Sequence, residues 1–122
     1  MAVKCASFRW QPVELILEVG NEMPIWKTAA FRVKPESRAR CEAAIREFVD
    51  AVRANEPETL HYTSLRQGDG EDTYLHVMAF ADERAEERHR SSDWVRQFVA
   101  VLYPETVDGV TFTDYQPVAA AT

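Results

Sequence analysis

The chain has 122 residues and a formal net charge of −6, because 20 acidic residues outnumber 14 basic ones. This length predicts a single domain with one modest hydrophobic core. The basic residues are interleaved with acidic ones, whereas binding to a phosphate backbone relies on clustered Lys and Arg, so composition disfavours a nucleic-acid partner. No segment approaches the ~20 apolar residues of a membrane span, and the N-terminus lacks a signal-peptide core. These features predict a cytoplasmic protein that contacts no membrane.

Residues 1–24 follow no regular period, although Val13 to Val19 alternates like a short strand. The segment carries many apolar side chains, so we expect this N-terminal extension to pack on its own sheet or on a second subunit. The folded domain is expected to span residues 25–117, followed by a short tail at 118–122. The two cysteines, Cys5 and Cys41, have no metal-ligand spacing and are interpreted as structural.

Alternating side chains from Ile25 to Val33 predict the first core strand, which Pro35 ends. A long amphipathic helix is predicted next, because apolar residues recur at helical spacing. Asn55-Glu56-Pro57 ends this helix, since proline disfavours a helical residue before it. The apolar stripe consists of Cys41, Ala44, Ile45, Phe48, Val49 and Val52.

Two further strands, Leu60 to Leu65 and Thr73 to Phe80, are predicted to form a hairpin across Gly68-Asp69-Gly70. With Asp69-Gly70 at the turn centre, Thr63 faces His76. One side of the hairpin is then aromatic and polar: His61, Thr63, Tyr74, His76, Met78 and Phe80. The other side carries Leu60, Tyr62, Leu75, Val77 and Ala79. The smaller aliphatic side is expected to pack on helices, which leaves the aromatic side uncovered; a one-residue change of register would regroup the first of these strands.

A second helical region is predicted from Asp82 to Tyr103. Ser91-Ser92-Asp93 interrupts it with residues typical of helix caps, so it is either one helix or two. Pro104 ends it, and Val110 to Gln116 predicts the last strand. The order β-α-β-β-α-β predicts an α+β, ferredoxin-like fold with a four-stranded antiparallel sheet and helices on one face. The other sheet face needs a partner or a ligand.

The segment Ala54-Asn55-Glu56-Pro57-Glu58-Thr59-Leu60-His61-Tyr62 resembles the "Glu-Pro-Gly-Thr-Leu-x-Tyr" junction of antibiotic-biosynthesis-monooxygenase domains. The third strand, the Asp82-Glu83 helix start, His89, Ser92 and the closing strand are similar to the second half of that family. The resemblance covers residues 25–117. It implies a dimeric α+β barrel and, in some members, cofactor-free oxygenation of an electron-rich aromatic such as a quinol or anthrone.

The sequence departs from the family at several positions. Glu58 stands where Gly is usual, and Met78 stands where many members carry Glu. The similar haem-degrading branch uses an Asn-Trp-His set, of which only His89 has a counterpart, because Ala79 occupies the Trp position. Haem degradation is therefore disfavoured.

His89 matches the helix histidine of the family and is predicted to be catalytic as an acid or base, with Arg32 orienting a substrate anion. The predicted substrate-binding residues suit either a flat aromatic ligand or a dry subunit interface. They are Trp26, Tyr74, His76, Met78, Phe80 and Tyr115. His61 and His76 lie on separate strands without a paired carboxylate, so no metal site is predicted.

Two functions remain open on the sequence. The first is a homodimeric monooxygenase that needs no metal, flavin or other cofactor. The second is a noncatalytic dimeric domain of the same fold that binds a small ligand or mediates an interaction.

Overall fold

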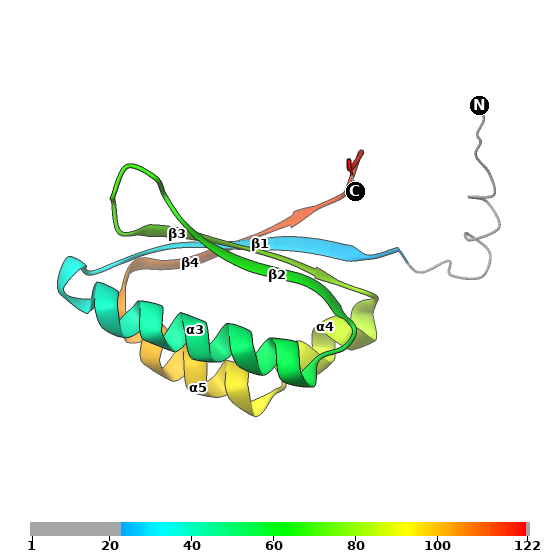
Figure 1. Ribbon diagram of the computed structural model, residues 1–122, viewed down its shortest axis with the longest axis horizontal. Coiled ribbons are helices and arrows are strands. Elements are labelled where there is room, and N and C mark those ends of the chain that lie inside the picture. The colour runs from blue at the N-terminus through cyan, green and yellow to red at the C-terminus, as the bar shows by residue number, and fades with distance from the viewer. Residues whose placement is uncertain (1–22, 122) are drawn as a thin grey trace.

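The computed structural model describes residues 23–121, so the predictions for Cys5 and for the packing of the N-terminal extension lie outside the described residues. Four strands form one antiparallel sheet in the order β2-β3-β1-β4. The helices lie against one face of the sheet (Figure 1). This arrangement confirms the predicted ferredoxin-like α+β fold. In chain order the elements are β1 (Ile25–Val33), η2 (Pro35–Ser37), α3 (Arg38–Asn55), β2 (Thr59–Arg66), β3 (Thr73–Phe80), α4 (Glu83–Arg90), α5 (Asp93–Leu102), η3 (Tyr103–Glu105) and β4 (Thr106–Tyr115).

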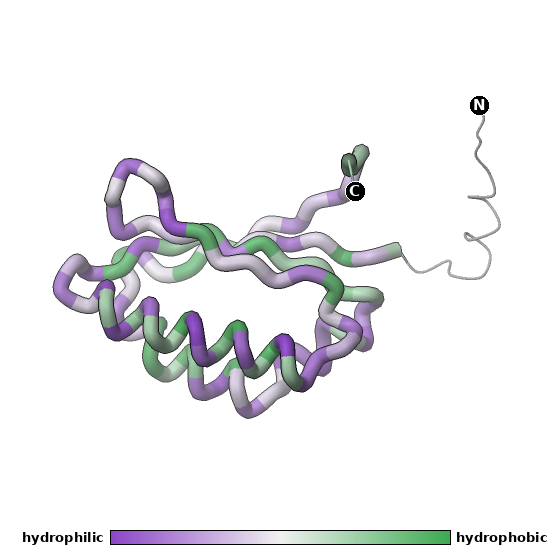
Figure 2. The backbone as a smooth tube through the Cα atoms, viewed as in Figure 1, coloured by the Kyte–Doolittle hydropathy of each residue, from purple (hydrophilic) through white to green (hydrophobic). Residues whose placement is uncertain are grey.

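Helix α3 buries the predicted apolar stripe. Cys41, Ile45, Phe48 and Val52 are all buried, and the free Cys41 thiol is fully enclosed. Along α3 and α5 the colour alternates between apolar green and polar purple (Figure 2), as expected for helices with one buried face. Cys41 is therefore a core residue, as the sequence predicts.

The second helical region consists of two helices, because each has its own N-cap. The carboxylate of Asp82 accepts a hydrogen bond from the backbone N–H of Ala85 at 2.8 Å and so caps α4. The hydroxyl of Ser92 accepts one from Val95 at 3.1 Å and caps α5. The cap-type residues thus end one helix and start the next.

Strand β4 begins four residues earlier than predicted. Its pairing with β1 shifts between Phe31 and Arg32, and the interrupting residues Asp108 and Gly109 both have positive φ, 68° and 77°. This geometry is a β-bulge, which lets the chain pair with β1 on both sides of an irregular step.

The predicted facing of β3 is wrong, whereas Tyr62 on β2 faces the helices as expected. Tyr74, His76, Met78 and Phe80 point toward the helices and are between 1% and 4% exposed, whereas Leu75 on the opposite face is 37% exposed. The aromatic side of β3 packs on the helices because α3 and α5 present the rings of Phe48 and Phe98 to the sheet, and these rings pack against large side chains. Trp26 and Arg32 do lie on the uncovered face, as predicted, because they alternate with buried Ala29 and Phe31.

The hairpin register also differs by one residue from the prediction. Thr63 pairs with Val77, and Ser64 pairs with His76. The connecting loop is closed by a bond from the Gln67 N–H to the Thr73 carbonyl. The shift places Tyr62 opposite Met78, on the same side of the hairpin as His76, because a slip of one residue changes which side chains of two strands share a face.

Replacing a core residue of α3 tests this assignment of the buried face. Ile45 is 6% exposed, so Ile45→Ala is expected to lower the free energy of unfolding by about 2–5 kcal/mol in urea denaturation. The control Val101→Ala removes an apolar side chain that is 37% exposed and should change it by less than about 0.5–1 kcal/mol. Equal losses in both variants would contradict the described core.

Candidate functional site

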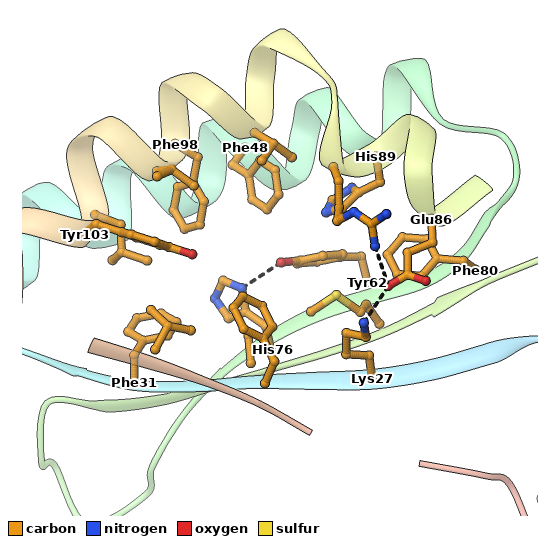
Figure 3. A pocket seen from close by; sticks show the side chains of 18 residues that line it. Lys27, Phe31, Phe48, Tyr62, His76, Phe80, Glu86, His89, Phe98 and Tyr103 are labelled. Carbon is orange, nitrogen blue, oxygen red and sulfur yellow. Dashed lines mark hydrogen bonds and ion pairs between the residues drawn. The ribbon is translucent and has the colours of Figure 1, made fainter. Parts of the chain in front are cut away.

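A cavity of about 460 Å³ lies between the helices and the sheet. Its sheet side comes mainly from β1, β3 and β4, and its helix side from α3, α4 and α5. Figure 3 shows Phe48, Phe98 and His89 reaching in from the helices, opposite Phe31, Tyr62 and His76 from the strands. The volume falls within the range typical of sites for small organic ligands.

The helix side of the cavity is built on stacked aromatic rings. The rings of Phe48 and Phe98 are parallel, with centroids 4.4 Å apart, and they join α3 to α5. Helix α5 packs on α3 through this contact while its own apolar residues Val95, Val99 and Leu102 line the cavity. The space between α5 and the β1-β4 side of the sheet is therefore left for a ligand.

His89 lies on the cavity wall and is held by a buried carboxylate. Its Nδ1 is 3.0 Å from both carboxylate oxygens of Glu56. Its Nε2 makes no hydrogen bond within residues 23–121. Because an ionised carboxylate only accepts hydrogen bonds, Nδ1 carries a proton, and in the neutral form of the ring Nε2 has a free lone pair.

Glu56 is ionised although it is only 5% exposed. Burial alone would raise its pKa, but hydrogen bonds from His89, Thr59 and Trp94 outweigh burial and hold the pKa below its ordinary value. The Thr59 hydroxyl donates at 2.6 Å and the Trp94 indole N–H donates at 2.5 Å. The carboxylate thus has donors from three elements, and it fixes the orientation of His89.

His76 forms a second polar point in the same cavity. Its Nδ1 is 2.9 Å from the Tyr62 hydroxyl (Figure 3), and the ring is 1% exposed. Burial lowers the pKa of His76 to about 4, so the ring is neutral at physiological pH. Burial also raises the pKa of Tyr62, which therefore stays a phenol.

An ion cluster closes one side of the cavity. The Lys27 ammonium donates to Glu86 at 2.5 Å, and Arg90 lies 3.4 Å from the same carboxylate. The bond to Glu86 raises the pKa of Lys27 despite partial burial. These three side chains also border a polar surface depression next to Asp114, so they separate the apolar interior from the surface.

The structure brings together part of the predicted site. The cavity is lined by His89, His76, Met78 and Phe80. Arg32, Trp26 and Tyr115 lie instead on the uncovered face, where Trp26 pairs with Tyr115 across β1 and β4. Within one protomer these three residues therefore do not reach the ligand that His89 would contact.

Tyr74 is buried but lies apart from the cavity. Its hydroxyl donates to Glu42 on α3 at 2.6 Å, and it borders a separate depression between α3 and β2. Burial, together with the bond to Glu42, raises the pKa of Tyr74 to about 12. The structure gives Tyr74 a role in joining β3 to α3.

Several residues of the site were not predicted, among them Glu56, Tyr62 and Phe98. Glu56 and Tyr62 both belong to the Glu-Pro-x-Thr-Leu-x-Tyr junction, so the motif carried a signal for them. Glu56 was interpreted only as part of a helix stop, and Tyr62 was assigned to a different face from His76 by the register error. Phe98 lies within the predicted helical region from Asp82 to Tyr103, but no site role was predicted for it.

No group of three or more His, Cys, Asp or Glu residues is arranged to hold a metal ion within residues 23–121. None of the helices that the structure describes has the length and apolar character of a membrane span.

The fold is shared with several solved bacterial structures. A protein from Caulobacter crescentus, provisionally assigned as an antibiotic biosynthesis monooxygenase, has a TM-score of 0.75 at 22% identity; the match covers 84% of this chain and 97% of that one. A protein from Bacteroides thetaiotaomicron with the same provisional assignment has a TM-score of 0.76 at 14% identity, covering 82% and 94%. At these identities the likeness concerns the fold alone. No curated protein sequence matches the chain.

The family model for antibiotic biosynthesis monooxygenase matches residues 24–101, which include β1, the Glu56 junction, the β2-β3 hairpin, His89 and nearly all of α5. The matched segment is well over half of the chain. The chain therefore belongs to the antibiotic biosynthesis monooxygenase family.

Proposed function

We propose that the protein is a monooxygenase that oxidises an electron-rich aromatic molecule, of the quinol or anthrone kind, inside the cavity. The observation that supports this most directly is the His89–Glu56 pair on the wall of an apolar space of ligand size. An imidazole oriented by a buried carboxylate is an arrangement suited to general-base catalysis. Family membership supports the reaction class.

In the proposed reaction, His89 Nε2 accepts an acidic proton from the bound substrate. The Glu56 carboxylate, which the Nδ1–H contacts, stabilises the imidazolium that forms. The electron pair left on the substrate makes the ring system a good reductant toward O₂, so neither metal nor flavin is required.

For a substrate with a reactive methylene group, the overall reaction is balanced in atoms and electrons. The carbon loses two hydrogens and gains one oxygen atom from O₂ as a carbonyl, and the second oxygen atom leaves as water with both hydrogens. O₂ is the oxidant and the substrate is the only reductant. His89 returns the proton it accepted when the peroxide intermediate loses water.

The apolar walls serve the same chemistry in two ways. Phe48 and Phe98 offer a flat surface on which an aromatic ring can stack. Exclusion of water strengthens the electrostatic interaction between the imidazolium and the substrate anion, because the local dielectric constant is low.

The uncovered sheet face supports a homodimer. It exposes Leu65 and Leu75, which pair across β2 and β3, and Tyr115, which pairs with Trp26, is 55% exposed on the edge strand β4. The partner we propose for this sheet face is the same face of a second copy, as in the dimeric α+β barrel that the family resemblance implies.

Turnover is tested through His89. His89→Gln preserves a hydrogen bond to Glu56 but removes the base, so the enzymatic rate of O₂ consumption with anthrone or a naphthoquinol should fall by about 10²–10⁴-fold. The measurement is an oxygen-electrode assay corrected for spontaneous oxidation, with ¹⁸O₂ incorporation into the product. The matched control is His61→Gln, which changes an exposed histidine on the other sheet face and should leave the rate unchanged.

An unchanged rate in His89→Gln would refute the catalytic role of His89. Tight binding of the aromatic without O₂ consumption above the spontaneous rate would favour the second function, a noncatalytic ligand-binding domain.

The proposed dimer is tested by two single variants, each of which places one negative charge on a different surface of the domain. Leu75 and Val101 are each 37% exposed, the first on the uncovered sheet face and the second on α5. Leu75→Glu should convert a dimer to a monomer in size-exclusion chromatography with light scattering, because the charge would be buried in the interface. Val101→Glu should remain dimeric. A wild-type monomer at micromolar concentration would contradict the proposed dimer.

A further inference from the structure

His76 presents a buried nitrogen to the cavity without a partner. Its Nε2 is the buried side-chain polar atom that lacks a hydrogen bond within residues 23–121. The surrounding rings are those of Phe31, Phe98 and Tyr62, with centroids 5.1, 6.0 and 5.5 Å from that of His76. A buried polar atom left unpaired in such surroundings is costly, which indicates that a ligand atom pairs with it.

The bond to Tyr62 decides whether this nitrogen donates or accepts. If His76 Nδ1–H donated to Tyr62, the buried phenol O–H and the Nε2 lone pair would both lack a partner. If the phenol donates to Nδ1, the phenol proton is satisfied and a single unpaired group remains, the Nε2–H. The second arrangement leaves fewer unpaired groups and is therefore favoured. His76 thus turns an N–H donor toward the cavity.

His89 presents a hydrogen-bond acceptor to the cavity, whereas His76 presents a donor. Its proton is held on Nδ1 by Glu56, so its Nε2 is an acceptor. The Tyr62 ring lies between the two histidines, with centroids 5.5 Å from that of His76 and 5.8 Å from that of His89. The cavity therefore carries one donor and one base at separate points of an otherwise largely apolar wall.

From this pair we infer that His76 Nε2–H binds the substrate oxygen that becomes negatively charged when His89 removes the proton. The inference rests on the proposed function. It narrows the substrate to flat molecules in which a carbonyl oxygen and an acidic C–H lie at separate positions of one conjugated ring system.

The chemical step is a proton transfer and needs no oxidant. The C–H bond breaks, the proton goes to His89 Nε2, and the electron pair moves through the conjugated ring to the oxygen at His76. The oxyanion is stabilised by the Nε2–H, in the manner of an oxyanion hole. Tyr62 acts through His76 as a positioning residue, because it keeps Nδ1 unprotonated and Nε2 protonated.

This step can be measured without O₂. Under argon in D₂O, anthrone should exchange its methylene hydrogens for deuterium in the presence of the protein faster than in buffer, as followed by mass spectrometry. His76→Phe should slow the exchange by about 10²–10³-fold, the loss typical of one oxyanion donor. His76→Gln keeps an N–H donor and should retain most of the rate. His89→Gln should abolish the exchange.

Binding provides the second readout and reports on folding. Wild-type protein should bind anthrone roughly tenfold more tightly than anthracene, which lacks the oxygen, since one hydrogen bond is gained. His76→Phe should lose this preference while binding anthracene as the wild type does, which shows an intact cavity. His89→Gln should keep the preference.

The inference is overturned if wild-type protein shows no exchange above buffer, if His76→Phe exchanges as fast as wild type, or if His76→Gln is as impaired as His76→Phe. Exchange that depends on both histidines, without O₂ consumption, would support this inference and refute the oxygenation step. Normal O₂ consumption in His76→Phe would support the oxygenation step and refute the role inferred for His76.

Discussion

The structure depends on one buried charge, the carboxylate of Glu56 at the end of α3. It binds donors from β2, α4 and α5, so the helical layer and the edge strand meet at a single side chain. A buried carboxylate is stable only when its hydrogen bonds are complete, because desolvation otherwise costs several kcal/mol. Loss of any one donor would therefore disturb both the helix packing and the orientation of His89. Structure and proposed chemistry share the same constraint.

The cavity is a consequence of how α5 is supported. Helix α5 packs on α3 through the stacked rings of Phe98 and Phe48, and this contact holds α5 in place beside the cavity. Atoms that line an apolar cavity have fewer van der Waals contacts than atoms in a close-packed core. A ligand that fills the space restores those contacts, so binding and stability are coupled. The partly exposed β4, including Phe112, fits this view because little of the helical layer covers it.

Local patterns were sufficient for the elements but not for the site. The helical stripe through Cys41 and Ile45, the caps at Asp82 and Ser92, and the strand alternation in β1 depend on neighbours within a few residues. These features could be predicted. Which face of β3 packs on the helices depended on the side chains that the helices present to the sheet. The hairpin register depended on the hydrogen bond from the Gln67 N–H to the Thr73 carbonyl. Neither is encoded in the period of the strand itself.

The pair between Glu56 and His89 shows the same limit most clearly. The two residues are 33 positions apart, and nothing in their immediate sequence reports on their contact. The family motif marked both positions separately, while only the folded chain joins them. His76 was placed among the substrate-binding residues on the correct side of its strand, but that side was assigned to the wrong layer. Its partner Tyr62 was separated from it by a single residue of register.

The two histidines differ because of their partners rather than their own chemistry. A neutral imidazole can donate from either nitrogen, and the group bonded to Nδ1 decides which. An ionised carboxylate, which can only accept, makes His89 a base toward the cavity, whereas a phenol that must donate makes His76 a donor. Glu56 does not line the cavity, and Tyr62 contributes its ring to the wall while its hydroxyl faces His76. The hydrogen-bonding role of each histidine toward the cavity is thus set by a group bonded to its Nδ1, so Glu56→Gln or Tyr62→Phe would change that role while keeping the side chains that form the cavity wall.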